Sequence, residues 1–314
     1  MRTRIFLPRD LAFARPAVLR RKVRISQSPA DTIRKLLAGG ATINMPGVYD
    51  ALSTRLATRA GFEVLFVSGY SVSASRLGAP DYGYLTQTEI ADTARSICSN
   101  TDLPVIVDAD TGYGNPLNCI RTADLLYGAG AAGIFLEDQV WPKKCGHFAG
   151  KRVVETEEWL AKLKAVVDQR ERGVDLFLVA RTDALSTRGI EDAIDRARRA
   201  RDLGVDAIFV EAPPDVESLE RVANEVPGVV RVANMIEGGR TPLLSESELH
   251  DLGYDLIVTP LTALFAAAKA VEEVLAVLRR EGTVRDHQDM MVSFGGFEPI
   301  VDLERHQALE DRYR

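Results

Sequence analysis

Residues 105–114 read VIVDADTGYG, an apolar run that leads directly into two carboxylates and two glycines. Apolar runs that do not alternate with polar residues are typical of parallel strands covered on both faces. Because residues i and i+2 of a strand point to the same side, Asp108 and Asp110 are expected to converge where this strand ends. The glycines that follow leave the backbone open at this point.

The same order of apolar run, polar turn and amphipathic stretch recurs along the chain. The predicted strands are Ala41–Met45, Val64–Ser68, Val105–Ala109, Gly133–Leu136, Leu176–Ala180, Ala207–Val210, Val229–Ala233 and Leu256–Val258. Eight strand–helix units with right-handed crossovers predict a (β/α)8 TIM-type barrel, whose active site lies at the carboxyl ends of the strands. A doubly wound open sheet is the alternative, but no G-x-G-x-x-G sequence follows the first strand.

Helices are predicted between the strands and beyond the last one. The candidates are Asp50–Ala60, Thr88–Cys98, Leu117–Tyr127, Thr156–Gln169, Ile190–Asp202, Val216–Glu225 and Leu264–Arg280. Glycine commonly ends a helix in a left-handed conformation, and we expect this of Gly61, Gly128, Gly173, Gly204 and Gly253. The chain then divides into a basic extension (residues 1–35), a barrel (36–282) and a C-terminal helical segment (283–314).

Composition limits the class of protein. The chain has 314 residues, which suits one barrel of roughly 250 residues with extensions. Its net charge of -6 argues against a nucleic-acid partner, and no apolar stretch reaches the ~20 residues of a membrane helix. The chain has three cysteines, and their spacing is not that of a disulfide-bonded domain, which indicates a reducing compartment and hence the cytoplasm. The Arg-rich stretch Met1–Arg24 leaves a role as an organellar transit peptide open.

Acidic residues at the strand ends predict a metal site. Asp108 and Asp110 end the third strand, and Glu137 ends the fourth. Adjacent carboxylates repel one another unless a cation or a proton lies between them, and Mg²⁺ prefers oxygen ligands. The alternative is an Asp-rich turn that caps the next helix. Calcium is disfavoured because the chain has no EF-hand-like loop.

The stretch Pro142–His147 (PKKCGH) predicts a functional loop. Lys143, Lys144 and His147 flank Cys145, and such neighbours are expected to stabilise a thiolate and lower the pKa of the thiol. Gly146 permits a sharp turn that would let the loop close over the site. The alternatives are a surface loop with an incidental cysteine, or a Cys-His hydrolase for which no orienting third residue is identified.

Other strand ends carry groups suited to binding a carboxylate. Arg181 ends the fifth strand, and a guanidinium group binds carboxylates in a bidentate manner; the alternative is an ion pair with Glu137 or Asp183. Three further strands end in polar or glycine residues, which are Ser68-Gly69-Tyr70, Glu211-Ala212 and Asn234-Met235. Polar groups on so many strand ends of an apolar barrel indicate one common site.

Together these residues resemble the isocitrate lyase / phosphoenolpyruvate mutase superfamily. The motifs are PGVYDAL (46–52), Ser68-Gly69, LGAPD (77–81), DADTGYG (108–114), EDQ (137–139), KKCGH (143–147), ARTD (180–183) and NMIEGG (234–239). The resemblance implies a Mg²⁺-dependent barrel, with Mn²⁺ as the alternative ion. It also implies a homotetramer whose eighth helix is exchanged between paired subunits.

The resemblance also implies individual roles. Asp108 would approach the metal directly, and Asp81, Asp110 and Glu137 would act mostly through water. The residues that bind the substrate would be Ser68, Gly69, Tyr70, Gly146, Arg181 and Asn234. The stretch Lys143–His147 would be a gating loop with catalytic side chains, in which Cys145 donates a proton. Tyr49 and Glu211 are the two candidates for the base.

The subfamily is indicated by the cysteine. The loop with its cysteine resembles the corresponding loop of the lyases in this superfamily. This resemblance implies cleavage of a malate-type 2-hydroxy acid, such as 2-methylisocitrate or 2,3-dimethylmalate. The products would be an α-keto acid such as pyruvate and a second carboxylic acid. The NMIEGG stretch also resembles carboxyphosphonoenolpyruvate phosphonomutase, so phosphonomutase is the alternative activity. A non-catalytic binding barrel is disfavoured because every expected metal and loop residue is present.

Overall fold

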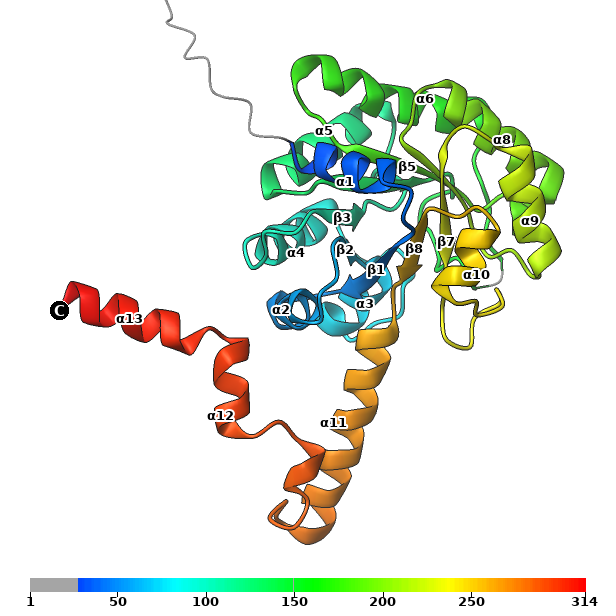
Figure 1. Ribbon diagram of the computed structural model, residues 1–314. Helices are drawn as coiled ribbons and strands as arrows, with labels where there is room; N and C mark the ends of the chain where they lie inside the picture. Colours follow the sequence, from blue (N-terminus) through cyan, green and yellow to red (C-terminus); the bar gives the residue numbers. More distant parts are fainter. Residues whose placement is uncertain (1–27, 149) are drawn as a thin grey trace, which may run out of the picture.

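The computed structural model describes residues 28–148 and 150–314, in which eight parallel strands close into one barrel (Figure 1). The strands are β1 Ile43–Val48, β2 Leu65–Val67, β3 Val105–Asp108, β4 Gly133–Glu137, β5 Phe177–Thr182, β6 Ala207–Val210, β7 Val230–Asn234 and β8 Leu256–Thr259. β1 pairs with β8 as well as with β2, which closes the sheet. The predicted (β/α)8 barrel is confirmed, and the open sheet is wrong.

Helices connect successive strands on the outside of the barrel, and further helices precede β1 and follow β8. They are α1 Pro29–Ala38, α2 Ala51–Arg59, α3 Gly69–Val72, α4 Gln87–Cys98, α5 Pro116–Ala129, α6 Thr156–Val167, α7 Leu185–Arg188, α8 Ile190–Asp202, α9 Val216–Glu225, α10 Glu246–Asp251, α11 Thr262–Glu281, α12 Phe294–Phe297 and α13 Leu303–Tyr313. Gly173 is left-handed directly after the short 3₁₀ turn that follows α6. The prediction for Gly128 is wrong, because it lies inside α5 and Gly130, with φ of 99°, ends that helix.

Helix α1 closes the amino end of the barrel. Ala30 and Ile33 are fully buried among the side chains of the barrel interior. The Arg34 guanidinium lies 2.9 Å from both Asp175 and Asp206, in the turns that precede β5 and β6. The boundary expected at residue 36 therefore falls inside a helix that packs as part of the barrel. The basic stretch Met1–Arg24 lies outside the described residues.

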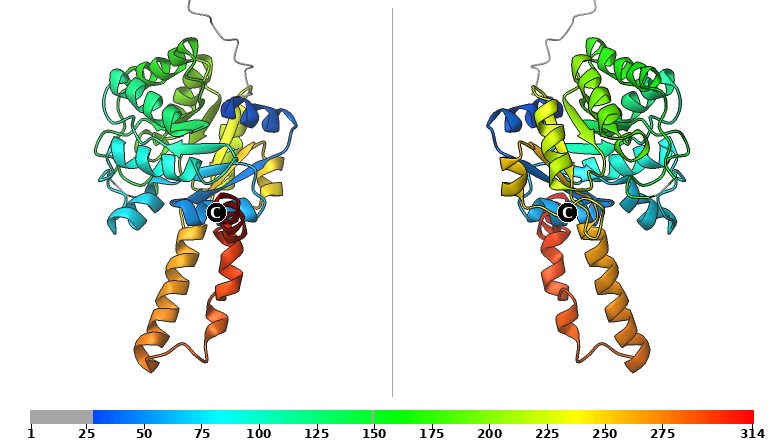
Figure 2. Two further views of the ribbon diagram at one scale, coloured as in Figure 1. Left: turned by 90° about the vertical axis from the view of Figure 1, so that its left-hand side faces the viewer. Right: turned by 90° about the vertical axis from the view of Figure 1, so that its right-hand side faces the viewer.

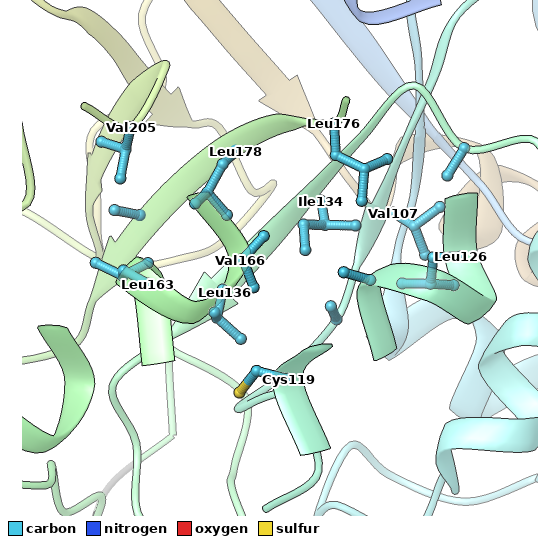
Figure 3. Close-up of a cluster of buried hydrophobic side chains, with 14 of the residues drawn as sticks. Val107, Cys119, Leu126, Ile134, Leu136, Leu163, Val166, Leu176, Leu178 and Val205 are labelled. Carbon is cyan, nitrogen blue, oxygen red and sulfur yellow. The ribbon is translucent and has the colours of Figure 1, made fainter. Parts of the chain in front are cut away.

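Two apolar layers hold the barrel together. The interior is filled by side chains from alternate strand positions, among them Met45, Phe66, Ile106, Phe135 and Phe209. The second layer lies between the strands and the outer helices, where Ile134, Leu136 and Leu178 meet Leu163 and Val166 of α6 (Figure 3). Strands buried on both faces explain why the sequence shows unbroken apolar runs.

The C-terminal arm, residues 262–314, extends away from the barrel (Figures 1 and 2). Helix α11 carries the chain outward, and the remainder turns back until the Arg59 guanidinium donates to the Pro299 carbonyl oxygen at 3.2 Å. The arm exposes large apolar side chains, including 89% of Phe294 and 77% of Tyr313. Exchange of a helix with another subunit stays a prediction. No helix in residues 28–148 and 150–314 has the length and apolar character needed to cross a membrane.

Candidate active site

A cavity opens at the carboxyl ends of the strands, with a volume of about 450 Å³ that includes its opening to solvent. Ten of the residues selected from the sequence line it, which are Ser68, Tyr70, Asp81, Asp108, Cys145, Gly146, His147, Arg181, Glu211 and Asn234. The parallel strands therefore bring together residues that are far apart in the chain.

Asp108 and Asp110 converge as the strand geometry predicts. The Asp110 backbone N–H donates to Asp108 Oδ1 at 3.1 Å, and Tyr113 donates its hydroxyl to Asp110 Oδ2 at 3.0 Å. Burial raises the pKa of Asp110 to about 6, although Lys143 opposes this shift. Gly69 is the residue that permits this crowding, because a Cβ there would lie 2.9 Å from Asp108 Oδ2.

Lys143 faces the acids rather than the cysteine. Its Nζ lies 2.8 Å from Asp81 Oδ2 and 2.7 Å from Asp110 Oδ1, and its side chain is buried. Burial works against the charged form, but the surrounding carboxylates hold the pKa of Lys143 well above its usual value. The ammonium group therefore links the loop after β4 to the acidic side of the cavity.

The buried carboxylates at this end of the barrel are of the kind that binds a cation. Burial raises the pKa of Glu137 well above its usual value, and Glu137 Oε1 has no hydrogen-bond partner among the described residues. Six buried carboxylates at this end of the barrel (Asp81, Asp108, Asp110, Glu137, Asp183 and Glu211) face three buried cations (Lys143, Lys151 and Arg181). An excess of buried negative charge is relieved by a divalent cation.

The arrangement fits a hydrated ion better than a fully chelated one. Within residues 28–148 and 150–314, no three His, Cys, Asp or Glu side chains are placed to chelate one ion together. Mg²⁺ commonly retains several waters and takes only one or two protein carboxylates directly. Asp108 as the direct ligand, with Asp81, Asp110 and Glu137 acting through water, stays a prediction.

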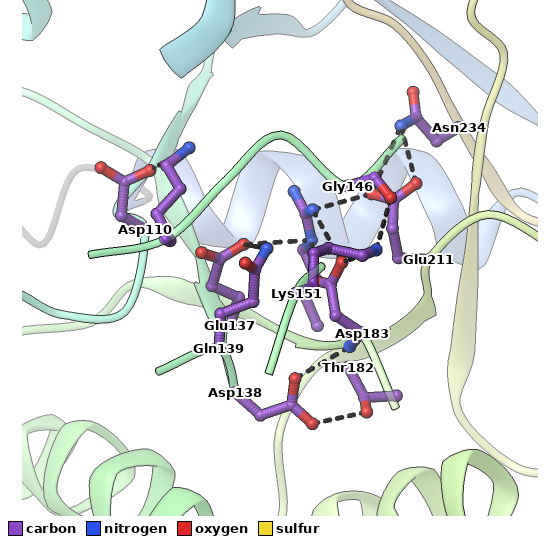
Figure 4. A network of polar contacts seen from close by, with 12 residues as sticks. Asp110, Glu137, Asp138, Gln139, Gly146, Lys151, Thr182, Asp183, Glu211 and Asn234 are labelled. Carbon is purple, nitrogen blue, oxygen red and sulfur yellow. Dashed lines mark hydrogen bonds and ion pairs between the residues drawn. The ribbon is translucent and has the colours of Figure 1, made fainter. Parts of the chain in front are cut away.

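Arg181 lies between the acids and the cavity. Its Nη2 is 3.0 Å from Glu211 Oε2, and its Nε is 3.0 Å from Asp183 Oδ2 and 3.3 Å from Glu137 Oε2 (Figure 4). The guanidinium also lies over the Phe209 ring, 5.4 Å from its centroid. The ion pairs expected as the alternative are therefore present, and Arg181 also lines the cavity, where its binding of a carboxylate stays a prediction.

The expected low pKa of Cys145 is wrong. Burial raises the pKa of the thiol to about 12. Asp81 and Glu211 raise the pKa further, and the lowering effect of Lys143, which is paired with Asp81 and Asp110, is smaller. Lys144 lies over the Tyr82 ring. Cys145 therefore lines the cavity as a protonated thiol, which suits a proton donor and not a nucleophile.

His147 and Asn234 both face Glu211. The Arg240 backbone N–H donates to His147 Nδ1 at 3.0 Å, which leaves the proton of a neutral ring on Nε2, 3.3 Å from Glu211 Oε1. Asn234 Nδ2 donates to the same carboxylate at 3.3 Å. Despite burial, Arg181 and His147 lower the pKa of Glu211 to about 2. Glu211 is therefore ionised and accepts hydrogen bonds.

Tyr49 is the predicted residue that lies away from the cavity; Gly69, Asp110, Glu137 and Lys143 do not line it either, but each contacts a residue of the site. β1 ends at Val48, and Asp50 already caps α2 by accepting the Ser53 N–H. The Tyr49 side chain consequently packs against the outer apolar layer. Of the two candidates for the base, only Glu211 lines the cavity. Lys151, which contacts Asp183 at 2.5 Å, was not expected, because its spacing in the sequence fits no motif.

Apolar side chains complete the cavity. Phe66, Phe135, Phe209 and Val258 form its floor and belong to the barrel interior. Tyr70, Ile236, Pro260 and Leu261, from the segments that follow the strands, also line it. A closed (β/α)8 barrel with ionisable groups gathered over such a floor defines an α/β-barrel enzyme.

Comparison with known proteins agrees with this assignment. Residues 33–279 match the family described as phosphoenolpyruvate phosphomutase. The chloroplastic carboxyvinyl-carboxyphosphonate phosphorylmutase of Arabidopsis thaliana is 49% identical over 89% of this chain and 83% of that protein. The 2,3-dimethylmalate lyase of Eubacterium barkeri is 41% identical over 90% of this chain and 98% of that protein.

Two similar proteins have solved structures with small molecules bound. An oxaloacetate acetylhydrolase in complex with 3,3-difluorooxalacetate has a TM-score of 0.86 at 34% identity, over 91% of this chain and 97% of that one. A phosphonopyruvate hydrolase in complex with oxalate and Mg²⁺ has a TM-score of 0.80 at 28% identity, over 91% and 99%. This chain belongs to the phosphoenolpyruvate mutase/isocitrate lyase superfamily of enzymes, as its motifs predicted.

Proposed function

We propose that this chain is a Mg²⁺-dependent lyase that cleaves a malate-type 2-hydroxy acid into an α-keto acid and a carboxylic acid. The observation that carries the proposal is the position of the Cys145 thiol, whose pKa burial raises and which lines the same cavity as Arg181 and Asp108. A general acid must hold its proton until the reaction needs it. The 2,3-dimethylmalate lyase relative supports this class of substrate.

The proposed roles follow from the charges of the side chains. Arg181 binds the substrate carboxylate next to the hydroxyl carbon, with Asn234 and the Ser68–Gly69 backbone around it. Glu211 is ionised and accepts the proton of the C2 hydroxyl, directly or through water. A divalent cation bound at Asp108 supplies positive charge that polarises the oxygen on C2.

Carbon–carbon cleavage then needs one proton donor. The C2 oxygen becomes a carbonyl oxygen as the C2–C3 bond breaks, and the electron pair of that bond remains on C3. The Cys145 thiol donates its proton to C3, which gives the second carboxylic acid. The resulting thiolate regains a proton before the next turnover. 2-Methylisocitrate and 2,3-dimethylmalate both have the hydroxyl and carboxylates that this scheme requires.

Phosphonomutase is the second candidate, and a specific finding favours it. The Arabidopsis relative, at 49% identity, is a carboxyvinyl-carboxyphosphonate phosphorylmutase. Arg181 would then bind a carboxylate next to the phosphorus group, and Cys145 would need another role. The two candidates differ in the bond that changes, which is carbon–carbon in the lyase and phosphorus–carbon in the mutase.

Assembly and location are part of the proposal. The exposed apolar side chains of the C-terminal arm support a homotetramer in which paired subunits exchange helices. We place the enzyme in the cytoplasm. The organellar alternative stays open, since the Arabidopsis relative is chloroplastic and Met1–Arg24 lies outside the described residues.

A coupled assay of pyruvate or glyoxylate release tests the function. The substrates are 2-methylisocitrate, 2,3-dimethylmalate, 2-methylmalate, isocitrate and oxaloacetate with Mg²⁺, and ³¹P NMR follows phosphonopyruvate and carboxyphosphonoenolpyruvate in parallel. We expect release of a keto acid that stops with EDTA and is abolished in Asp108→Ala. A shifted phosphorus signal without keto-acid release from any hydroxy acid would replace the lyase with the mutase.

A further inference from the structure

Lys151 is a buried lysine outside the motifs that led to the site. Its side chain keeps 2% of its accessible surface, and its Nζ contacts Asp183 Oδ1 at 2.5 Å and donates to the Gly146 carbonyl oxygen (Figure 4). A buried ammonium group is tolerated where it is paired and hydrogen-bonded, so these two contacts fix its position. Lys151 thereby connects the loop after β4 to the end of β5.

Asp183, which Lys151 contacts, also contacts Arg181. The Asp183 carboxylate is fully buried, and its Oδ2 accepts a hydrogen bond from Arg181 Nε at 3.0 Å. The Asp183 backbone N–H donates to Asp138 Oδ1 at 2.8 Å, which holds Asp183 in place. Asp183 thus lies between two cations. Without the ammonium group of Lys151, the Asp183 charge would act on Arg181 alone and draw the guanidinium toward itself.

Gly146 contacts Arg181 from the other side. A Cβ at Gly146 would lie 2.6 Å from Arg181 Nη2 and 2.5 Å from Glu211 Cδ, so the loop backbone packs directly against this ion pair. The carbonyl group that Lys151 holds belongs to this same glycine. One ammonium group therefore restrains Arg181 twice, through the carboxylate of Asp183 and through the backbone of Gly146.

We infer that Lys151 is a positioning residue for Arg181, which it keeps turned toward the cavity by balancing Asp183 and by holding Gly146 against the Arg181–Glu211 pair. Among the described residues, Lys151 is not part of the cavity lining, so it acts through these neighbours. The inference rests on the proposed function in one respect, namely that Arg181 binds the substrate carboxylate.

Lys151→Met tests the inference, because it removes the charge and keeps the length of the side chain. We measure the affinity for oxalate by calorimetry with Mg²⁺ present, together with kcat and KM. The affinity should fall about 10- to 100-fold, the usual loss when a partner that orients a binding side chain is removed. KM should rise by a similar factor and kcat should change much less.

Two variants serve as controls for charge and for site. Lys151→Arg keeps the charge and should recover most of the oxalate affinity. Lys164→Met removes an exposed lysine of α6 and should leave affinity and KM unchanged. An oxalate affinity equal to wild type in a folded Lys151→Met protein would overturn the inference. A Lys151→Arg protein as weak as Lys151→Met would also overturn it, because packing and not charge would then decide the affinity.

The double variant Lys151→Met/Asp183→Asn separates positioning from stability. Removing both charges relieves the unpaired buried carboxylate that the single variant leaves, so the double variant should regain thermal stability. Gly146 stays unrestrained, so oxalate affinity should stay low. Recovery of affinity together with stability would overturn the role of Gly146 in the inference, because balancing the Asp183 charge would then explain the whole effect. Oxalate binding needs no turnover, so a wild-type protein without lyase activity would refute the proposed function and leave this test intact.

Discussion

Adding one methyl group at Gly146 tests how closely the loop must approach Arg181. The new Cβ would lie 2.5 Å from Glu211 Cγ and Cδ and 2.6 Å from Arg181 Nη2. Favourable carbon contacts lie at about 3.5–4.0 Å, so the loop would have to retreat by about 1 Å. Gly146 does not have a positive φ, so alanine adds a steric contact without backbone strain.

A displacement of this size should be visible in catalysis. Misplacing reacting groups by about 1 Å costs up to ~10²-fold in rate, which corresponds to roughly 2.7 kcal/mol of transition-state stabilisation. We expect kcat/KM of Gly146→Ala to fall by about this factor on the hydroxy acid that the wild-type enzyme cleaves. The melting temperature should also fall, because Gly146 is buried against the Arg181–Glu211 pair and overpacking costs about 1–3 kcal/mol, so kcat/KM is measured well below that temperature.

Gly128→Ala is the matched control for the same chemical change. Gly128 lies within α5, and an added Cβ there meets no atom within 4 Å. Alanine in a helix is favoured over glycine by roughly 0.5–1 kcal/mol, so this variant should be slightly more stable and fully active. If Gly146→Ala keeps kcat/KM within about threefold of wild type, less than ~1 kcal/mol, the loop does not need this approach.

Three further changes test other parts of the structure. Cys145→Ser should lower turnover by at least ~10²-fold with an unchanged melting temperature, and near-normal turnover would exclude the thiol as donor. Burial raises the pKa of Cys98 and Cys119 to about 11 and of Cys145 to about 12, above the ~8.5 of unfolded cysteine. The unfolded chain therefore loses these protons first, so stability to urea should decline from about pH 8.5 to 10, and a flat profile would contradict the burial. Arg34→Met should lower the free energy of unfolding by about 1–2 kcal/mol, and exposed Arg95→Met by less than about 0.5; equal losses would refute the role of α1.

The barrel is predictable from the sequence because its strands are buried on both faces. This burial produces the unbroken apolar runs, and each of the expected strands overlaps an observed one. Helix α1 is harder to predict, since it presents only a narrow apolar stripe with Ala30 and Ile33 and follows a basic stretch. Its position depends on ion pairs between Arg34 and two acids more than 140 residues away, which no local pattern reveals.

The site is predictable where a strand sets the direction of a side chain. Asp108, Arg181 and Glu211 reach the cavity because parallel strands end at the same rim. Tyr49 misses it because the backbone turns into α2 one residue after β1. The pKa of Cys145 was predicted in the wrong direction, because the burial of the thiol, which the neighbouring residues in the sequence do not reveal, outweighs the effect of the charges around it.

The floor of the cavity is also the upper layer of the barrel interior. Phe66, Phe135 and Phe209 stack there, with ring centroids 4.8 and 5.7 Å apart. Enlarging the floor would therefore open a void in the core, at ~3–5 kcal/mol for loss of a buried phenylalanine side chain. Tyr70, Ile236 and Leu261 line another side of the cavity and do not belong to this interior cluster. Divergence of substrate range in this enzyme is thus confined to one side of the cavity, and a directed-evolution library would yield folded variants mainly from that side.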